Sequence, residues 1–138
     1  MTCELCTPQP DPVWRNDQLT VILVDDANYP GFCRVIWNAH AKEMSDLTAG
    51  ERLAMMDAVN QVELAQRAVL QPDKINLASL GNVVPHLHWH VIPRFADDAH
   101  FPNPVWARAV RAPDPATLAA RRALLPQLLA AIVQRLTP

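Results

Sequence analysis

Asn82-Val83-Val84-Pro85-His86-Leu87-His88-Trp89-His90-Val91-Ile92-Pro93-Arg94 is the stretch whose pattern organises the whole chain. Histidine recurs at every second position, with large apolar residues between. A period of two is that of a β-strand, in which successive side chains point to opposite faces. The pattern therefore predicts that His86, His88 and His90 share one face of a strand, about 6.6–7 Å apart.

Three imidazoles on one face indicate chemistry more than packing. Imidazole titrates near neutral pH and can act as nucleophile, acid, base or metal ligand. The structural alternative is a half-buried polar face, which is costly unless every ring is hydrogen-bonded. A second alternative is a metal site, because His-x-His on a strand is a good chelating pair.

The stretch resembles the signature of the histidine triad (HIT) superfamily, His-φ-His-φ-His-φ-φ with φ apolar. His86 to Ile92 fits every position, and the resemblance extends over roughly residues 3–106. It implies that His88 is a nucleophile that attacks the α-phosphorus of a nucleotide. It also implies that His90 lies beside the phosphate and leaving group, and that His86 supports the nucleophile.

The same resemblance implies the substrate-binding residues. Asp25, with Asp26 as an alternative, follows a predicted strand where relatives bind the ribose hydroxyls. Asn76 occupies the position of an amide that contacts phosphate, and Asn82 follows Gly81 directly before the triad segment. Trp106 belongs to a proline-rich aromatic loop that we expect at the rim of the site.

Two positions depart from the pattern of the superfamily. Phe32 stands where many relatives have a fourth histidine, and Val83 stands where many have serine or threonine. These departures remove polar partners and predict a more apolar substrate side.

Cys3 and Cys6 form a Cys-x-x-Cys pair, which is typical of a metal or redox centre. Prolines follow instead of a helix, which disfavours the redox interpretation. Zinc needs two further ligands, for which His40 and His86 are the candidates. Some bacterial members of the superfamily complete a zinc site with residues in matching places. The alternative is that both cysteines are small apolar residues near a frayed terminus.

Size and charge limit the class of protein. A chain of 138 residues with 50% hydrophobic and 19% charged residues predicts a single globular domain. The net charge of −2 and the lack of an apolar run of about 18 residues predict neither a nucleic-acid nor a membrane partner. No signal-peptide pattern opens the chain, so we expect a cytoplasmic protein.

The remaining patterns predict an α+β fold with about five mostly antiparallel strands and one main helix. Thr48-Ala49-Gly50-Glu51 is a capping box that opens a helix ending near Leu70. The apolar spacing of Leu118, Leu125, Leu129, Ile132 and Leu136 predicts a helical tail, which Pro126 should kink or divide. We expect a HIT-like domain over residues 1–112 and a helical C-terminal extension over 113–138.

The predicted function is nucleotide hydrolysis or nucleotidyl transfer on dinucleoside polyphosphates or adenylated amines, with a purine nucleotide as substrate. No cofactor is required for the chemistry, structural zinc is expected at the cysteine pair, and Mg²⁺ could accompany a polyphosphate. The resemblance also implies a homodimer. Two alternatives stay open: a non-catalytic nucleotide-binding module, and a metal-dependent hydrolase that uses the histidine cluster as ligands.

Overall fold

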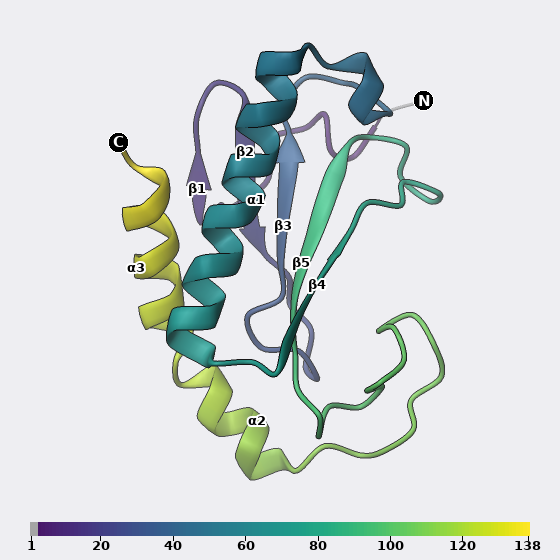
Figure 1. The fold of residues 1–138 in the computed structure, drawn as a ribbon, viewed down its shortest axis with the longest axis vertical. Coiled ribbons are helices and arrows are strands. Elements are labelled where there is room, and N and C mark those ends of the chain that lie inside the picture. Colours follow the sequence, from purple (N-terminus) through teal and green to yellow (C-terminus); the bar gives the residue numbers. More distant parts are fainter. Residues whose placement is uncertain (1–2) are drawn as a thin grey trace.

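A single five-stranded antiparallel sheet forms the centre of the molecule (Figure 1). The computed structural model describes residues 3–138. The strands lie in the order β1-β2-β3-β5-β4. Their bounds are β1 (Trp14–Arg15), β2 (Leu19–Leu23), β3 (Cys33–Trp37), β4 (Lys74–Ala78) and β5 (His88–Arg94). The histidine strand β5 is therefore internal, with β3 on one side and β4 on the other.

The main helix α1 (Ala49–Leu70) lies across one face of this sheet and follows a short 3-10 turn, η1 (Met44–Asp46). The predicted capping box is present. The Thr48 hydroxyl accepts a hydrogen bond from the Glu51 N–H at 3.2 Å, and the Glu51 carboxylate accepts one from the Thr48 N–H at 2.8 Å. These bonds satisfy amides that the first helical turn leaves free. The helix ends before Pro72, with Gln71 in the left-handed conformation at φ 51°.

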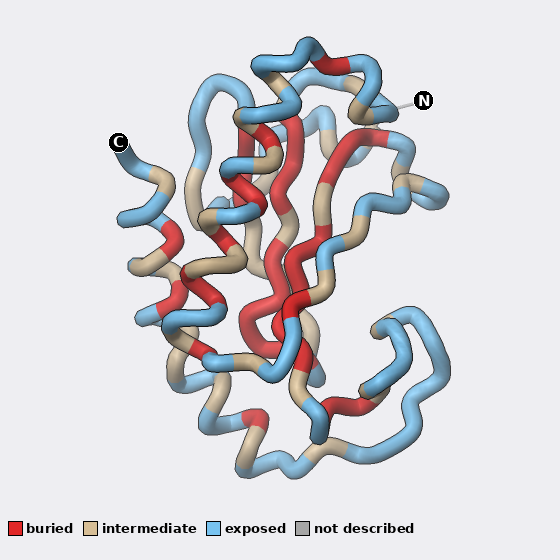
Figure 2. The backbone as a smooth tube through the Cα atoms, in the orientation of Figure 1, coloured by how far each residue is buried: buried red, intermediate tan, exposed pale blue. Residues whose placement is uncertain are grey.

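The two faces of the sheet have different chemistry. Val21, Val35 and Val91 point toward α1 and are fully buried against its apolar residues, including Met55 and Val62. Burial in Figure 2 follows the central strands and the inner side of the helix. The opposite face carries His88 and His90, as the alternation in the sequence predicts. The predicted α+β fold is thus confirmed.

The C-terminal tail forms α2 (Pro115–Arg122) and α3 (Leu125–Leu136), and Figure 1 shows α3 beside α1. Pro126 lies in the first turn of α3, where its missing N–H costs no hydrogen bond. Leu128 and Ile132 are fully buried in the main core. The tail therefore belongs to the same core as the sheet. Among the described residues no single helix is long and apolar enough to cross a membrane, although α2 and α3 together meet that test as a bent pair.

Substitution of Leu128 tests this contribution of the tail to the core. Leu128→Ala should lower the free energy of unfolding by about 2–5 kcal/mol, because it leaves a cavity between α3 and α1. Val133→Ala on the same helix is the matched control, since Val133 is 40% exposed, and it should cost roughly 0.5 kcal/mol or less. Urea unfolding followed by circular dichroism measures both. Equal losses in the two variants would contradict the packing of α3 described here.

Candidate functional site

The middle of β5 presents two histidines on the sheet face that α1 does not cover. His88 is paired with Ile36 of β3, and His90 is paired with Arg34 of the same strand. The imidazole centroids of His88 and His90 lie 5.0 Å apart, with the rings nearly perpendicular. Both side chains are buried, and both contribute to the wall of a cavity.

The protonation site of His88 follows from its hydrogen bond. Its Nδ1 lies 2.6 Å from the backbone carbonyl oxygen of His86. A carbonyl oxygen can only accept, so the neutral ring carries its proton on Nδ1 and a lone pair on Nε2. Burial lowers the pKa of His88, and the bond to the His86 carbonyl partly opposes this shift. His88 is therefore a neutral imidazole with a basic Nε2, which is the form a nucleophile requires.

His86 occupies a different environment from the other two histidines. The strand begins at His88, and Pro85 with a short turn from His86 N–H to the Val84 carbonyl precedes it. The His86 ring is completely buried, and its Nε2 donates to the Trp37 carbonyl oxygen at 2.5 Å. Its Nδ1 consequently carries the lone pair. His86 is absent from the cavity that His88 and His90 line together, although it borders a smaller hollow with His88. Only His88 and His90 therefore share the face predicted from the period of two.

The His86 lone pair points into a cluster of four potential metal ligands. His86 Nδ1 lies 3.3 Å from Cys3 Sγ, 3.4 Å from Cys6 Sγ and 3.3 Å from His40 Nδ1, and Cys6 Sγ lies 3.3 Å from His40 Nδ1. All four atoms lie within 4.8 Å of one another. Tetrahedral zinc with its usual bond lengths separates such ligand atoms by about 3.3–3.8 Å. The donor set and spacing therefore fit zinc.

His90 is enclosed by aromatic rings. Phe32 and Trp106 both meet its ring edge-on, with centroids 5.7 and 5.2 Å away. Its Nδ1 is buried and has no hydrogen-bond partner among the described residues, which agrees with the apolar replacement at Phe32. Burial, followed by the charges of His88 and Arg34, lowers the pKa of His90 to about 4. His90 is thus neutral at physiological pH.

The cavity beside these histidines has a volume of about 410 Å³. Four of the predicted site residues line it: His88, His90, Asn82 and Trp106. A second group of lining residues was not predicted from the sequence. It consists of Arg34 from β3, Leu80 and Val84 from the loop before β5, and Glu4, Leu5 and Gln9 from the N-terminal segment. Arg34 had a signal in the sequence, because it is the one charged residue in an otherwise apolar strand.

Asp25 and Asn76 do not line this cavity. Asp25 is exposed and borders a separate hollow near Arg122. The Asn76 side-chain oxygen accepts a hydrogen bond from Arg94 Nη1 at 2.7 Å, which places Asn76 in a structural network. A role for Asp25 or Asn76 in substrate binding stays a prediction.

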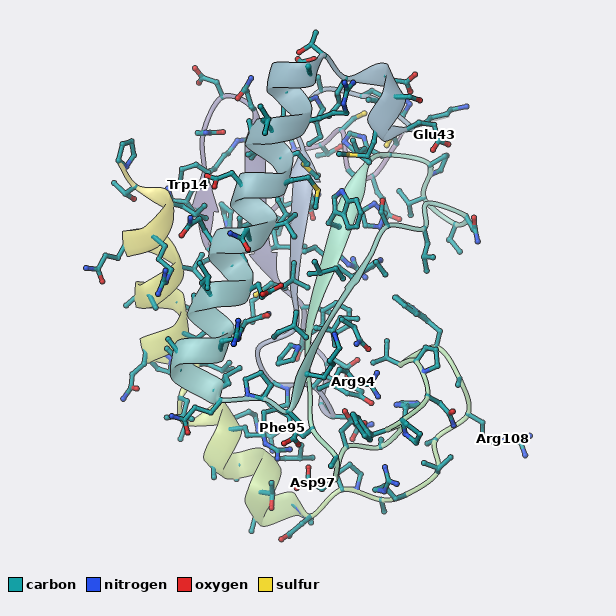
Figure 3. The ribbon with its side chains drawn as sticks, viewed as in Figure 1. Trp14, Glu43, Arg94, Phe95, Asp97 and Arg108 are labelled. Atoms are coloured by element: carbon teal, nitrogen blue, oxygen red, sulfur yellow. The ribbon has the colours of Figure 1, made fainter. Side chains whose placement is uncertain are left out.

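Arg94 anchors the loop that carries Trp106 (Figure 3). Its guanidinium donates to the Asp98 carboxylate at 2.8 and 3.1 Å and to the Asn103 carbonyl at 2.7 Å. Burial alone would raise the pKa of Asp98, but Arg94 and the loop amides of Phe95, His100 and Phe101 hold it at about 2. The loop following β5 is therefore fixed by a buried ion pair, which holds Trp106 against His90.

Comparisons with known proteins support this architecture. A family model described as the HIT domain matches residues 9–97, and the chain belongs to this family, whose members are commonly nucleotide hydrolases or transferases. A comparison with curated proteins returned no significant match.

Solved structures of histidine triad proteins share the fold. The one from Bradyrhizobium japonicum is 28% identical, with a TM-score of 0.72 over 91% of this chain and 89% of that one. The one from Sinorhizobium meliloti 1021 is 26% identical, with a TM-score of 0.70 over 90% and 87%. A Zn-bound family protein from Mycobacterium smegmatis is 24% identical, with a TM-score of 0.56 over 87% and 86%.

The buried neutral state of His90 predicts a pH dependence of stability. Below about pH 6.5 the unfolded chain binds a proton at this histidine, whereas the folded protein does so only near pH 4. The free energy of unfolding should therefore fall as the pH is lowered through this window. His90→Gln should lose less stability over the same range. Urea unfolding of both proteins from pH 7.5 to 4.5 tests this, and parallel pH profiles would contradict it.

Proposed function

We propose that this protein is a nucleotide hydrolase or nucleotidyl transferase that acts at the α-phosphorus of adenylated amines or dinucleoside polyphosphates. The observation that carries the proposal is the state of His88. Its proton is held on Nδ1 by a backbone carbonyl, and Nε2 has no hydrogen-bond partner among the described residues. A free, neutral imidazole nitrogen beside a cavity of nucleotide size supports covalent catalysis.

The reaction proceeds in two displacements at phosphorus. The lone pair of His88 Nε2 forms a bond to phosphorus, and the bond to the leaving group breaks. The leaving group departs with that electron pair and takes a proton from solvent. Water, or another acceptor hydroxyl, then attacks phosphorus and loses a proton to solvent, and the pair of the phosphorus–nitrogen bond returns to Nε2. One water is consumed in hydrolysis, and His88 regains its starting form.

The neighbouring groups position the substrate and stabilise charge. The carbonyl of His86 stabilises the positive charge that develops on the His88 ring, so His86 supports the nucleophile through its backbone. His90, fixed between Phe32 and Trp106, lies beside the phosphoryl group and presents its ring to it. Asn82 supplies polar groups from the loop before β5, and Trp106 offers an aromatic surface at the rim.

The metal-dependent alternative has weaker support than the nucleophilic one. Both nitrogens of His86 are engaged elsewhere, one with the Trp37 carbonyl and one with the cysteine cluster. His86 therefore does not join His88 and His90 in a three-histidine site. The non-catalytic binding module is favoured by one observation, the unpartnered Nδ1 of His90, and the nucleophile test below distinguishes it from an enzyme.

We further propose that Cys3, Cys6, His40 and His86 hold a structural zinc ion. The Zn-bound relative from Mycobacterium smegmatis supports this assignment, as do the spacing of the four ligand atoms and the tautomer of His86. Zinc bound here would join the N-terminal segment to His86. Glu4 and Leu5 of that segment line the cavity, so the metal would stabilise one wall of it. The expected homodimer and the purine base stay predictions.

Removal of the nucleophile tests the proposed reaction. His88→Asn should lower kcat by at least about 10³-fold, because the covalent route is lost, while leaving nucleotide affinity within a few-fold of wild type. His100→Asn is the matched control, since His100 lies outside the cavity, and it should keep its activity. Intact-protein mass spectrometry should detect a nucleotidyl adduct on wild type and His100→Asn only. A wild-type protein that binds nucleotide without ever forming the adduct would support the binding module instead.

Metal analysis tests the zinc proposal. Protein produced with zinc present should contain about one zinc per chain. Cys6→Ser should lower both the zinc content and the melting temperature, because metal binding contributes to folding stability. Cys33→Ala is the matched control: this buried cysteine lies in the core, so the variant should lose stability but keep its zinc. Zinc-free wild type with the melting temperature of the zinc-loaded protein would refute the proposal.

A further inference from the structure

Arg34 stands in an unusual position for a charged residue. It lies in the middle of β3, and its strand neighbours Cys33 and Val35 are completely buried on the α1 side. The Arg34 side chain therefore points to the opposite face, where it is half-buried and lines the cavity. In the sheet it is paired with His90, two residues along β5 from the proposed nucleophile His88.

The guanidinium of Arg34 forms no ion pair with the described residues. Its Nε is buried without a hydrogen-bond partner, and within residues 3–138 the structure records neither an ion pair nor a hydrogen bond for this side chain. Arg94, on the same face of the sheet, shows the contrast, because its guanidinium is fully paired with Asp98, Asn76 and Asn103. An arginine kept partly desolvated and unpaired costs stability, which a bound anion would offset.

The lining of the cavity sets the charge that this anion can carry. Arg34 is the sole lysine or arginine among the described lining residues, and Glu4 contributes the opposite charge at the same wall. Apolar surface around the rest of the cavity comes from Leu5, Leu80, Val83 and Trp106. A cavity with one arginine and otherwise mainly apolar walls suits a substrate in which one phosphate is joined to a weakly charged group.

We propose that Arg34 binds the non-bridging oxygens of the phosphate that His88 attacks. We also infer that the cavity takes nucleoside monophosphates joined to an amine in preference to polyphosphate chains. Both statements rest on the proposed nucleotidyl chemistry. A guanidinium can donate two parallel N–H bonds to a phosphate, which fixes the orientation of the group as well as attracting its charge. A polyphosphate would bring several further negative charges to a cavity in which Arg34 is the single lysine or arginine among the described lining residues.

Binding of AMP and adenosine isolates the phosphate contact. Wild type should bind AMP more tightly than adenosine in isothermal titration calorimetry. Arg34→Met should lower the ratio of AMP affinity to adenosine affinity by about tenfold or more, because hydrogen bonds to charged groups contribute roughly this factor to binding. The affinity for adenosine itself should stay unchanged. Arg34→Lys should recover part of the preference. Arg67→Met is the matched control, because Arg67 is largely exposed on α1 and is not among the residues that line the cavity.

The outcomes separate this inference from the proposed function. A wild type that neither binds AMP nor forms the nucleotidyl adduct would overturn both. A wild type that does both, together with an Arg34→Met variant that still prefers AMP over adenosine to the same degree, would overturn the role of Arg34 alone.

A substrate comparison tests the single-phosphate preference. Wild type should show a higher kcat/KM for adenosine 5′-phosphoramidate than for diadenosine tetraphosphate. Arg34→Met should lower kcat/KM for the phosphoramidate by at least about tenfold, and Arg34→Lys should restore part of it. A wild type that favours the tetraphosphate would contradict the single-phosphate preference.

Discussion

The hydrogen bond from His88 Nδ1 to the His86 carbonyl oxygen is the interaction on which this site depends. It selects the tautomer of His88, directs Nε2 away from the backbone and places the acceptor where positive charge will develop. The acceptor carbonyl cannot move freely. The same residue is anchored by its ring to the Trp37 carbonyl and lies within the cysteine cluster. The bond to Trp37 and the cluster of Cys3, Cys6, His40 and His86 thus both act on the residue whose carbonyl contacts the nucleophile.

The fold provides a rigid base for this unit. β5 lies inside the sheet and is hydrogen-bonded to β3 and β4, while α1 covers its apolar face. The loop after β5 is fixed by the buried Arg94–Asp98 pair, and the tail contacts the same segment. Arg121 pairs with Asp97 at 3.0 Å and stacks over the Phe95 ring, both of which Figure 3 labels near α2. Groups on strands and anchored loops keep their geometry better than groups on free loops, which suits a site that needs little reorganisation.

Local patterns in the sequence predicted much of this structure. The period of two placed His88 and His90 on one face, the capping box located the start of α1, and Pro126 marked the division of the tail. These predictions succeeded because each depends on residues close in sequence. The four residues proposed for zinc do lie together, but in the sequence alone their association rested on ligand chemistry and on the resemblance.

Contacts between residues distant in the sequence could not be predicted from local patterns. The direction of the His86 ring depends on Trp37 and the N-terminal segment, which no period reveals. The capture of Asn76 by Arg94 depends on the pairing of β4 with β5. The apolar stripe predicted for the tail omitted Leu128, a fully buried residue, because the break before α3 changes the phase of the helix. Arg34 is recognisable in the sequence as a charge in an apolar strand. Only the structure shows that its side chain lines the cavity without a hydrogen-bond partner among the described residues.

The tautomer of His88 is the quantity that tests this account most directly. Nitrogen-15 NMR of histidine-labelled protein at pH 7, with His88 assigned by comparison with His88→Asn, distinguishes a protonated ring nitrogen from an unprotonated one. We predict a proton on Nδ1 and an unprotonated Nε2. A proton on Nε2 would place the lone pair against the His86 carbonyl, remove the nucleophile from the cavity and contradict the mechanism.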